Sequence, residues 1–90
     1  MINDIGLWEN TFFNEPFVFP NPTHGSCLLD LRQHYSKVKI TVQDITGKSI
    51  SYHKNLSGRE FEILLPKTSG IYFLVIDVEG NRITRKVIKH

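Results

Sequence analysis

The sequence has a single cysteine, Cys27, among its 90 residues. One cysteine excludes an internal disulfide, so cysteine usage does not indicate a redox compartment. Long apolar runs are also missing, since none approaches the roughly 20 residues that a membrane-spanning helix needs. The opening MINDIGLWENTFF carries Asp4 and Glu9 where a secretory signal peptide has a basic start and a continuous apolar core. If the chain is exported, another part of a parent protein carries the first signal.

An excess of charge of one sign is lacking as well. Eleven Lys and Arg residues against nine Asp and Glu residues give a formal net charge of +2. The basic residues are dispersed along the chain, which argues against nucleic acid as a partner, because nucleic-acid binders gather them on one face. Charged residues make up 22% and hydrophobic residues 40% of the chain. These values are ordinary for one small globular domain with a single core.

Helical periodicity is absent, and short strand-like runs bounded by turns take its place. From Ile71 to Val78 every residue except Asp77 is apolar or aromatic, which is typical of a strand buried on both faces. The sequence Lys37 to Asp44 instead alternates between polar and apolar side chains as far as Gln43, which predicts a strand with one face exposed to water. Cys27 alternates with apolar neighbours and is expected to be a small buried residue.

The last segment, residues 82–88, is predicted to fold back on the core strand after a tight turn at Glu79-Gly80-Asn81, because Gly and Asn tolerate a positive φ. Arg85 and Ile88 break its alternation, which predicts a β-bulge. A basic, partly polar strand in this position is typical of a sheet edge. Edges are where another chain can add, so an edge-strand or swapped dimer is one possible state.

Seven short segments in all read as strands, at a spacing of roughly ten residues. This pattern predicts an all-β fold, an antiparallel β-sandwich of immunoglobulin-like dimensions with six to seven strands, and a partly open barrel is the alternative. Polar residues 33–36 and 55–59 are expected to form loops, and residues 1–16 a lead-in to a domain over residues 17–90. The predicted strands are residues 17–19, 26–31, 37–44, 48–54, 60–65, 71–78 and 82–88.

Four local signatures stand in fixed order: Pro20-Asn21-Pro22 with Gly25, Asp44-x-x-Gly47, Gly70-x-Tyr72, and Lys86-Val87-Ile88-Lys89. In this order and spacing they resemble the C-terminal sorting domain, type A, of cargo proteins exported by the type IX secretion system of the Bacteroidota. The resemblance covers about residues 17–89. Phe19 stands where the family more commonly has Tyr, and His90 follows the last Lys.

The resemblance implies an export address without catalysis of its own. Such domains end cargo proteins, are recognised by the outer-membrane translocon after crossing the inner membrane and periplasm, and are removed at the cell surface by a sortase-like peptidase. The cleaved bond would lie within residues 1–15, and the cargo would reach the cell surface or the medium. We expect the last strand to be the recognition element, through Arg82, Arg85, Lys86, Val87, Ile88 and Lys89. Mainly structural roles are expected for Pro20, Asn21, Pro22, Gly25, Asp44, Gly47, Gly70, Tyr72 and Gly80.

Metal, cofactor and catalytic sites are not expected. Asp44 echoes a calcium-binding turn, but no further oxygen ligands are spaced around it, so capping of the backbone is the better interpretation. The histidines, His24, His34, His53 and His90, form no ligand pair at short spacing. No motif places a nucleophile such as Cys27 beside a base. Tyr72 is expected to pack in the core with its hydroxyl bonded to a turn.

A second function of a different class stays open, that of an immunoglobulin-like carbohydrate-binding or adhesion module. Its sugar-stacking candidates are Trp8, Tyr35 and Tyr52. Loss of the last strand would abolish export for a sorting domain and would mainly lower glycan affinity for such a module.

Overall fold

The structure, a computed structural model, describes residues 15–90, which form five strands in one antiparallel sheet. The sheet order is β1-β2-β4-β5, and β3 also pairs with β2. Within this part of the chain no helix is long and apolar enough to cross a membrane. The strands are β1 (Phe17–Phe19), β2 (Ser26–Asp44), β3 (Ser49–Leu64), β4 (Gly70–Val78) and β5 (Asn81–Lys89).

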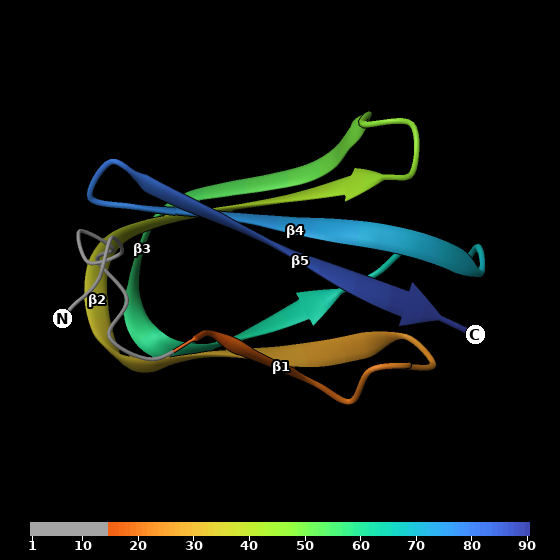
Figure 1. Cartoon of the computed structure of the whole chain (residues 1–90), viewed down its shortest axis with the longest axis horizontal. Coiled ribbons are helices and arrows are strands. Elements are labelled where there is room, and N and C mark those ends of the chain that lie inside the picture. Colours follow the sequence, from red (N-terminus) through yellow and green to blue (C-terminus); the bar gives the residue numbers. More distant parts are fainter. Residues whose placement is uncertain (1–14) are drawn as a thin grey trace, which may run out of the picture.

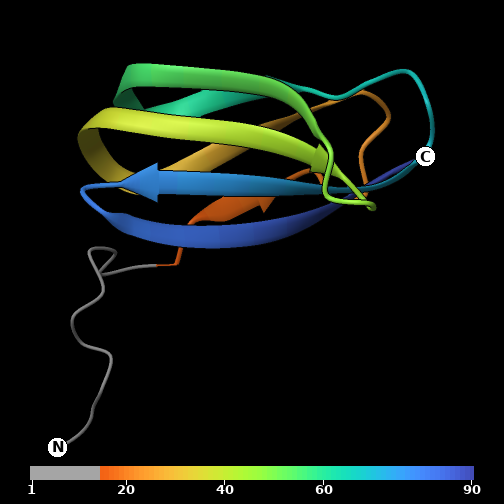
Figure 2. The same ribbon diagram turned by 90° about the horizontal axis from the view of Figure 1, so that it is seen from above.

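The sheet curls into two layers because the long hairpin of β2 and β3 bends near its middle (Figure 1). The first part of β2 pairs with β1 on one side and with the end of β3 on the other. The second part of β2 lies between β4 and the start of β3. Figure 2 shows the two layers from above. Because the bent strands enter both layers, one layer has three strand segments and the other has four. The predicted all-β antiparallel fold is confirmed, and its two sandwich-like layers are parts of one curled, half-barrel sheet of five strands.

The bend falls where the sequence predicted loops at residues 33–36 and 55–59, and those two expectations are wrong. The strands continue through both stretches, with shifts of register on either side of Tyr35. Arg32 and Asn55 have positive φ values of 73° and 59°. Such irregularities increase the twist of a strand without ending its pairing. Polar composition alone does not separate a bulged bend from a loop.

The core lies between the two layers. Alternate residues of β2 point into it, and Leu29, Val38 and Ile40 have no exposed surface. Cys27 is 3% exposed, and burial raises the pKa of its thiol, in keeping with the predicted role as a small buried residue. The buried cluster consists of Cys27, Leu29, Leu31, Tyr35, Val38, Ile40, Val42, Ile63, Tyr72, Leu74, Ile76, Val78 and Val87.

β5 pairs with β4 over its whole length in an unbroken register. The predicted bulge at Arg85 and Ile88 is therefore wrong. Arg85 lies opposite the core residue Leu74 and shares the inward face of β5, whereas Ile88 lies opposite Ile71 on the outer face. The turn before β5 follows the prediction: Glu79 and Gly80 have φ values of 52° and 81°, as a two-residue hairpin of type I′ requires.

Candidate recognition surface

The last strand is held from both sides over its second half. The side-chain amide of Asn21 donates from Nδ2 to the carbonyl of Lys86 at 2.9 Å and accepts from the N–H of Ile88 at 3.0 Å. The N–H of Thr23 then donates to the carbonyl of Ile88, and the N–H of His90 to the carbonyl of Thr23, both at 2.9 Å. The segment around Asn21 thus occupies the side of β5 that faces away from β4.

The sequence of this segment explains its shape. Pro20 and Pro22 lack an N–H and have a fixed φ, so the chain around Asn21 does not form a regular strand beside β5. The contacts with β5 at this point are therefore made by the side chain of Asn21. Thr23 is 2% exposed, and its hydroxyl contacts the carbonyl of Ser26 and accepts from the N–H of Gly25 at 3.2 Å. These contacts support a structural role for this signature.

The first half of β5 keeps an open edge. Because backbone groups alternate between the two sides of an antiparallel strand, those of Arg82 and Thr84 point the same way as the groups of Lys86 and Ile88 that Asn21 binds. The carbonyl of Thr84 accepts from Nη1 of Arg85 at 3.3 Å. Among residues 15–90, no backbone group pairs with the outward side of Arg82 or with the N–H of Thr84. From Arg82 to the N–H of Lys86, the edge therefore has outward backbone groups without a backbone partner among residues 15–90, whereas Asn21 occupies the carbonyl of Lys86. Unpaired groups of this kind are where a further strand can add to a sheet.

Three of the predicted recognition residues turn inward. Val87 is fully buried in the core. Lys89 is 9% exposed, and its ammonium donates to the carbonyl of Lys67 at 2.9 Å. Arg85 contacts the Glu15 carboxylate and donates from Nε to the carbonyl of Pro16 at 3.3 Å. These three side chains hold the domain together and are poorly placed to meet a partner.

The other three predicted residues face outward. Lys86 is exposed, lies opposite Phe73 of β4, and has no ion pair with any residue of the described range 15–90. Ile88 is partly exposed. Arg82 is exposed but binds Asp77, with Nε 2.7 Å from Oδ1. Of the basic side chains of β5, that of Lys86 is therefore the one most available to a partner.

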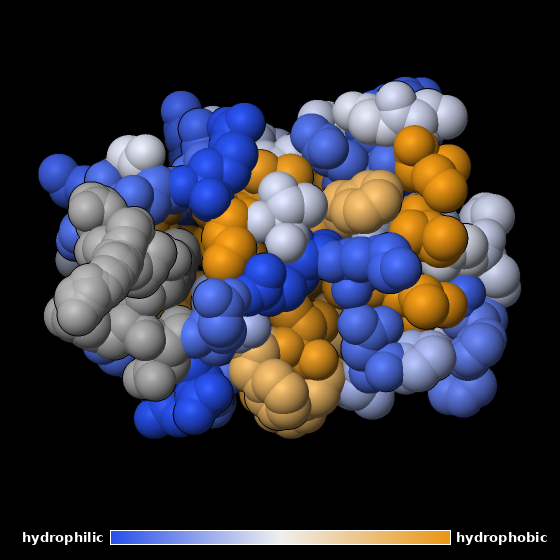
Figure 3. All heavy atoms as spheres, viewed as in Figure 1, coloured by the Kyte–Doolittle hydropathy of each residue, from blue (hydrophilic) through white to orange (hydrophobic). Residues whose placement is uncertain are grey.

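An exposed apolar patch that the sequence did not predict adjoins Lys86. We call Ile45, Ile50, Ile71, Phe73 and Ile88 the outer apolar patch. Ile45 and Ile50 are 65% and 43% exposed, the other three are partly exposed, and Ile45, Ile50 and Ile71 line one shallow hollow. Figure 3 shows apolar side chains over the adjoining ends of β4 and β5. The sequence predicted that this strand is buried on both faces. That prediction is wrong for the outer face of β4, where Ile71 and Phe73 are partly exposed.

The hairpin next to this patch is shaped by Asp44. Its Oδ1 accepts from the N–H and the hydroxyl of Thr46 at 2.9 and 2.6 Å and from the N–H of Lys48 at 3.0 Å. These hydrogen bonds, first that from the Thr46 hydroxyl, lower the pKa of the carboxyl. Gly47 has a φ of 90°, which a residue with a Cβ rarely adopts. This is the capping role that the sequence predicted.

Tyr72 also has the predicted contacts. Its ring is buried, at 5% exposure, and its hydroxyl donates to the carbonyl of Thr68 at 2.7 Å. That bond ties the loop before β4 to the core. Burial of the ring and the bond to Thr68 agree with the packing role that the sequence predicted for Tyr72.

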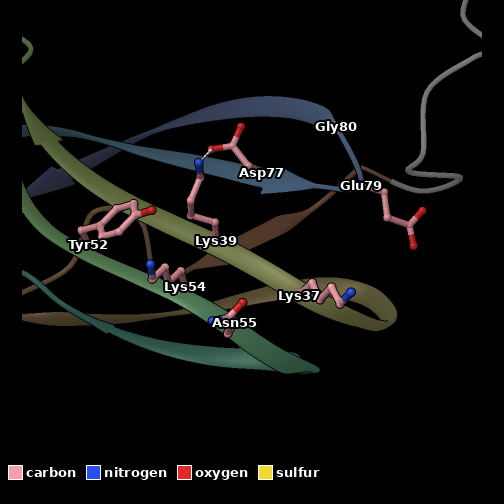
Figure 4. Close-up of a pocket in the computed structure, with 8 residues that line it drawn as sticks. All are labelled: Lys37, Lys39, Tyr52, Lys54, Asn55, Asp77, Glu79 and Gly80. Atoms are coloured by element: carbon pink, nitrogen blue, oxygen red, sulfur yellow. Dashed lines mark ion pairs between the residues drawn. The ribbon is translucent and has the colours of Figure 1, made fainter.

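A basic hollow lies on the outer face near the other end of the sheet (Figure 4). Its lining includes Lys37, Lys39, Lys54 and Tyr52. The ammonium of Lys39 lies 3.9 Å from the Asp77 carboxylate and 5.9 Å from the centroid of the Tyr52 ring. The charge of Lys39 is thus partly neutralised within the domain.

The structure gives little support to a sugar-stacking platform. Tyr35 is 6% exposed and cannot stack on a ligand, whereas Tyr52 is 53% exposed. Trp8 lies outside the described residues. Within residues 15–90, no three His, Cys, Asp or Glu side chains gather as metal ligands.

These features define a small antiparallel β-domain whose edge strand, β5, is paired with the segment around Asn21 over its second half only. The family of secretion system C-terminal sorting domains matches residues 17–90. The chain belongs to this family, the sorting domains of type IX secretion, as its motifs had indicated. No curated protein matches the chain. The members of this family are non-enzymatic tails that act as sorting signals. Membership therefore makes the chain a sorting signal for export to the cell surface or the extracellular space.

Proposed function

We propose that the outer-membrane translocon of type IX secretion recognises this domain on β5, through the open edge from Arg82 to Lys86 and the adjacent outer apolar patch. The observation that carries the proposal is the division of β5 into a half that Asn21 and Thr23 occupy and a half that stays open. Unrelated cargoes share only this domain, so the translocon needs a feature of the domain itself. A preformed strand edge provides backbone groups whose recognition does not depend on the cargo.

Lys86 and the outer apolar patch give this edge its specificity. A partner strand added to β5 would extend the sheet and bring its side chains next to Lys86 on the outer face. An acidic side chain there would meet a charge without an ion pair among the described residues. Apolar partner residues would cover Phe73 and Ile88, which this domain leaves partly exposed. Charge would then guide docking, and burial of the patch would hold the complex.

We further propose that a sortase-like peptidase cleaves a bond within residues 1–15 of the lead-in, and that the domain has no catalytic role. The contacts of Arg85 with Glu15 and Pro16 support this, because they fix the point at which the lead-in joins the sandwich. Because the lead-in is held to the sandwich at its C-terminal end, the residues before that point would stay within a fixed reach of the open edge of β5. The cargo would lie before residue 1 of this sequence.

The test is export of a fluorescent protein with an inner-membrane signal peptide in front and residues 1–90 behind, in a bacterium with type IX secretion. Lys86→Glu should keep the fold, because the side chain is exposed, and should leave the reporter in the periplasm. Lys54→Glu is the matched control, since Lys54 is also exposed, its ammonium has no ion pair among residues 15–90, and it lies on β3, which does not adjoin β5 in the sheet. Wild-type export of Lys86→Glu would contradict the proposed recognition surface.

A further inference from the structure

Two histidines from opposite ends of the domain lie side by side. The ring centroids of His24 and His90 are 6.1 Å apart, with 44° between the ring planes. Both side chains are exposed. These two histidines are far apart along the chain, so their spacing in the sequence does not indicate a ligand pair. The fold brings this pair together.

The backbone fixes this juxtaposition. Thr23 and Lys89 form a parallel bridge, held by the bonds from Thr23 N–H to the Ile88 carbonyl and from His90 N–H to the Thr23 carbonyl. Thr23 and Lys89 are both buried, at 2% and 9% exposure. Because successive side chains of an extended chain alternate between faces, the next residues, His24 and His90, share the outward face. Their side chains are therefore neighbours, as those of directly paired residues on two adjacent strands are.

We propose that His24 and His90 together bind a divalent transition-metal ion, with water completing the coordination. Imidazole nitrogen suits Cu²⁺, Ni²⁺ and Zn²⁺. With a metal–nitrogen bond of about 2.0–2.1 Å and about 1.1 Å from that nitrogen to the ring centre, the centroids of two ligating imidazoles lie roughly 4.5 to 6.4 Å apart. The observed 6.1 Å is within this span. Rotation of the exposed rings would bring one nitrogen of each to the metal.

The bound ion would join the segment around Asn21 to the end of β5 by a third tie, in addition to the backbone and amide hydrogen bonds. Metal binds the native pair and not the separated residues of the unfolded chain, so binding stabilises the fold by mass action. The order of affinity for such nitrogen ligands is Cu²⁺ above Ni²⁺ and Zn²⁺. The site is independent of the open half of the β5 edge.

The test is titration of the 90-residue chain, without a histidine tag, with NiCl₂ by calorimetry, and with CuCl₂ by two-dimensional amide NMR. We expect one Ni²⁺ per chain, and Cu²⁺ broadening centred on the amide signals of His24 and His90. His24→Ala and His90→Ala should each weaken Ni²⁺ binding by at least about 10-fold. Removal of a residue that only supports a metal ligand costs about 10- to 100-fold in affinity, so removal of a ligand itself should cost at least the lower value. The matched controls are His34→Ala and His53→Ala, which remove exposed histidines from the bend and from β3.

Unchanged Ni²⁺ affinity in both His24→Ala and His90→Ala would overturn the proposal, as would loss of binding in either control. One Ni²⁺ per two chains would also overturn it, because the metal would then bridge molecules. The Cu²⁺ broadening is measured on the unaltered chain, so it decides the question even if a variant fails to fold. Broadening centred on His34 or His53 would place the metal elsewhere.

Discussion

Replacing Asn21 with Ala should loosen the end of β5 without disturbing the core. Asn21 is exposed, and its amide makes two hydrogen bonds to the backbone of the last strand. Each such bond contributes a net of about 0.5–1.5 kcal/mol. Water can replace the lost partners at an exposed site, so we expect the free energy of unfolding to fall by about 1–2 kcal/mol. A domain of this size would then melt roughly 5–10 °C lower.

The amide of Ile88 reports this change locally, because it donates to Oδ1 of Asn21. Its native-state hydrogen exchange should accelerate by a factor of about 5–30, which corresponds to one to two kcal/mol. Asn21→Asp keeps an acceptor for Ile88 but sets a second oxygen against the carbonyl of Lys86. We expect it to be at least as unstable as Asn21→Ala. Urea unfolding followed by circular dichroism gives the global value for each variant.

Gln33→Ala is the control, since Gln33 is an exposed amide on the bend of β2 without a hydrogen bond to any other residue of the described range. Its unfolding free energy should stay within about 0.5 kcal/mol of the original. If Asn21→Ala unfolds like this control and the Ile88 amide exchanges at its original rate, Asn21 does not hold the last strand. The division of the β5 edge would then lack its physical basis.

Three further changes test individual contacts. Tyr72→Phe removes the hydroxyl bonded to Thr68 and should cost about 1 kcal/mol in urea unfolding, and a neutral result would remove Tyr72 from the loop contact. Asp44→Asn should destabilise the domain at neutral pH. Since the folded pKa of Asp44 lies below the ordinary 3.8, its carboxylate stabilises the fold above that pH, and the difference in unfolding free energy between the variant and the original should close as the pH falls below about 4. A difference that does not change with pH would refute this role of Asp44. Arg85→Ala should speed limited proteolysis next to Glu15 while lowering stability by no more than about 1 kcal/mol, and equal cleavage rates would show that Arg85 does not fasten the lead-in.

The strands of this domain were predictable where side chains alternate or where turn residues bound them. Lys37 to Asp44 shows this, as does the turn at Glu79 and Gly80, because both follow from local backbone and burial preferences. The path through residues 33–36 and 55–59 was not predictable. A bulged strand and a loop both expose polar side chains there, and only long-range pairing between β2 and β3 decides between them.

β5, the strand proposed for recognition, lies at a sheet edge as the sequence predicted, but the contacts of its residues were not readable from its own sequence. Arg85 and Lys89 were grouped with Lys86 because all three are basic, whereas their contacts with Pro16 and Lys67 turn two of them inward. The bond from Asn21 to Lys86 joins positions far apart in the chain. Local patterns carry no information on such partners. The same holds for the pairing of His24 with His90.

Site-specific photo-crosslinking during export tests the central claim, that the open edge of β5 meets the translocon. A photo-reactive amino acid at position 84 stands on that edge, and one at position 60 stands on an exposed position of β3 in the other layer. We expect crosslinks to the outer-membrane translocon from position 84 and not from position 60. Crosslinks from position 60 alone, with none from position 84 in a fusion that is exported normally, would contradict it.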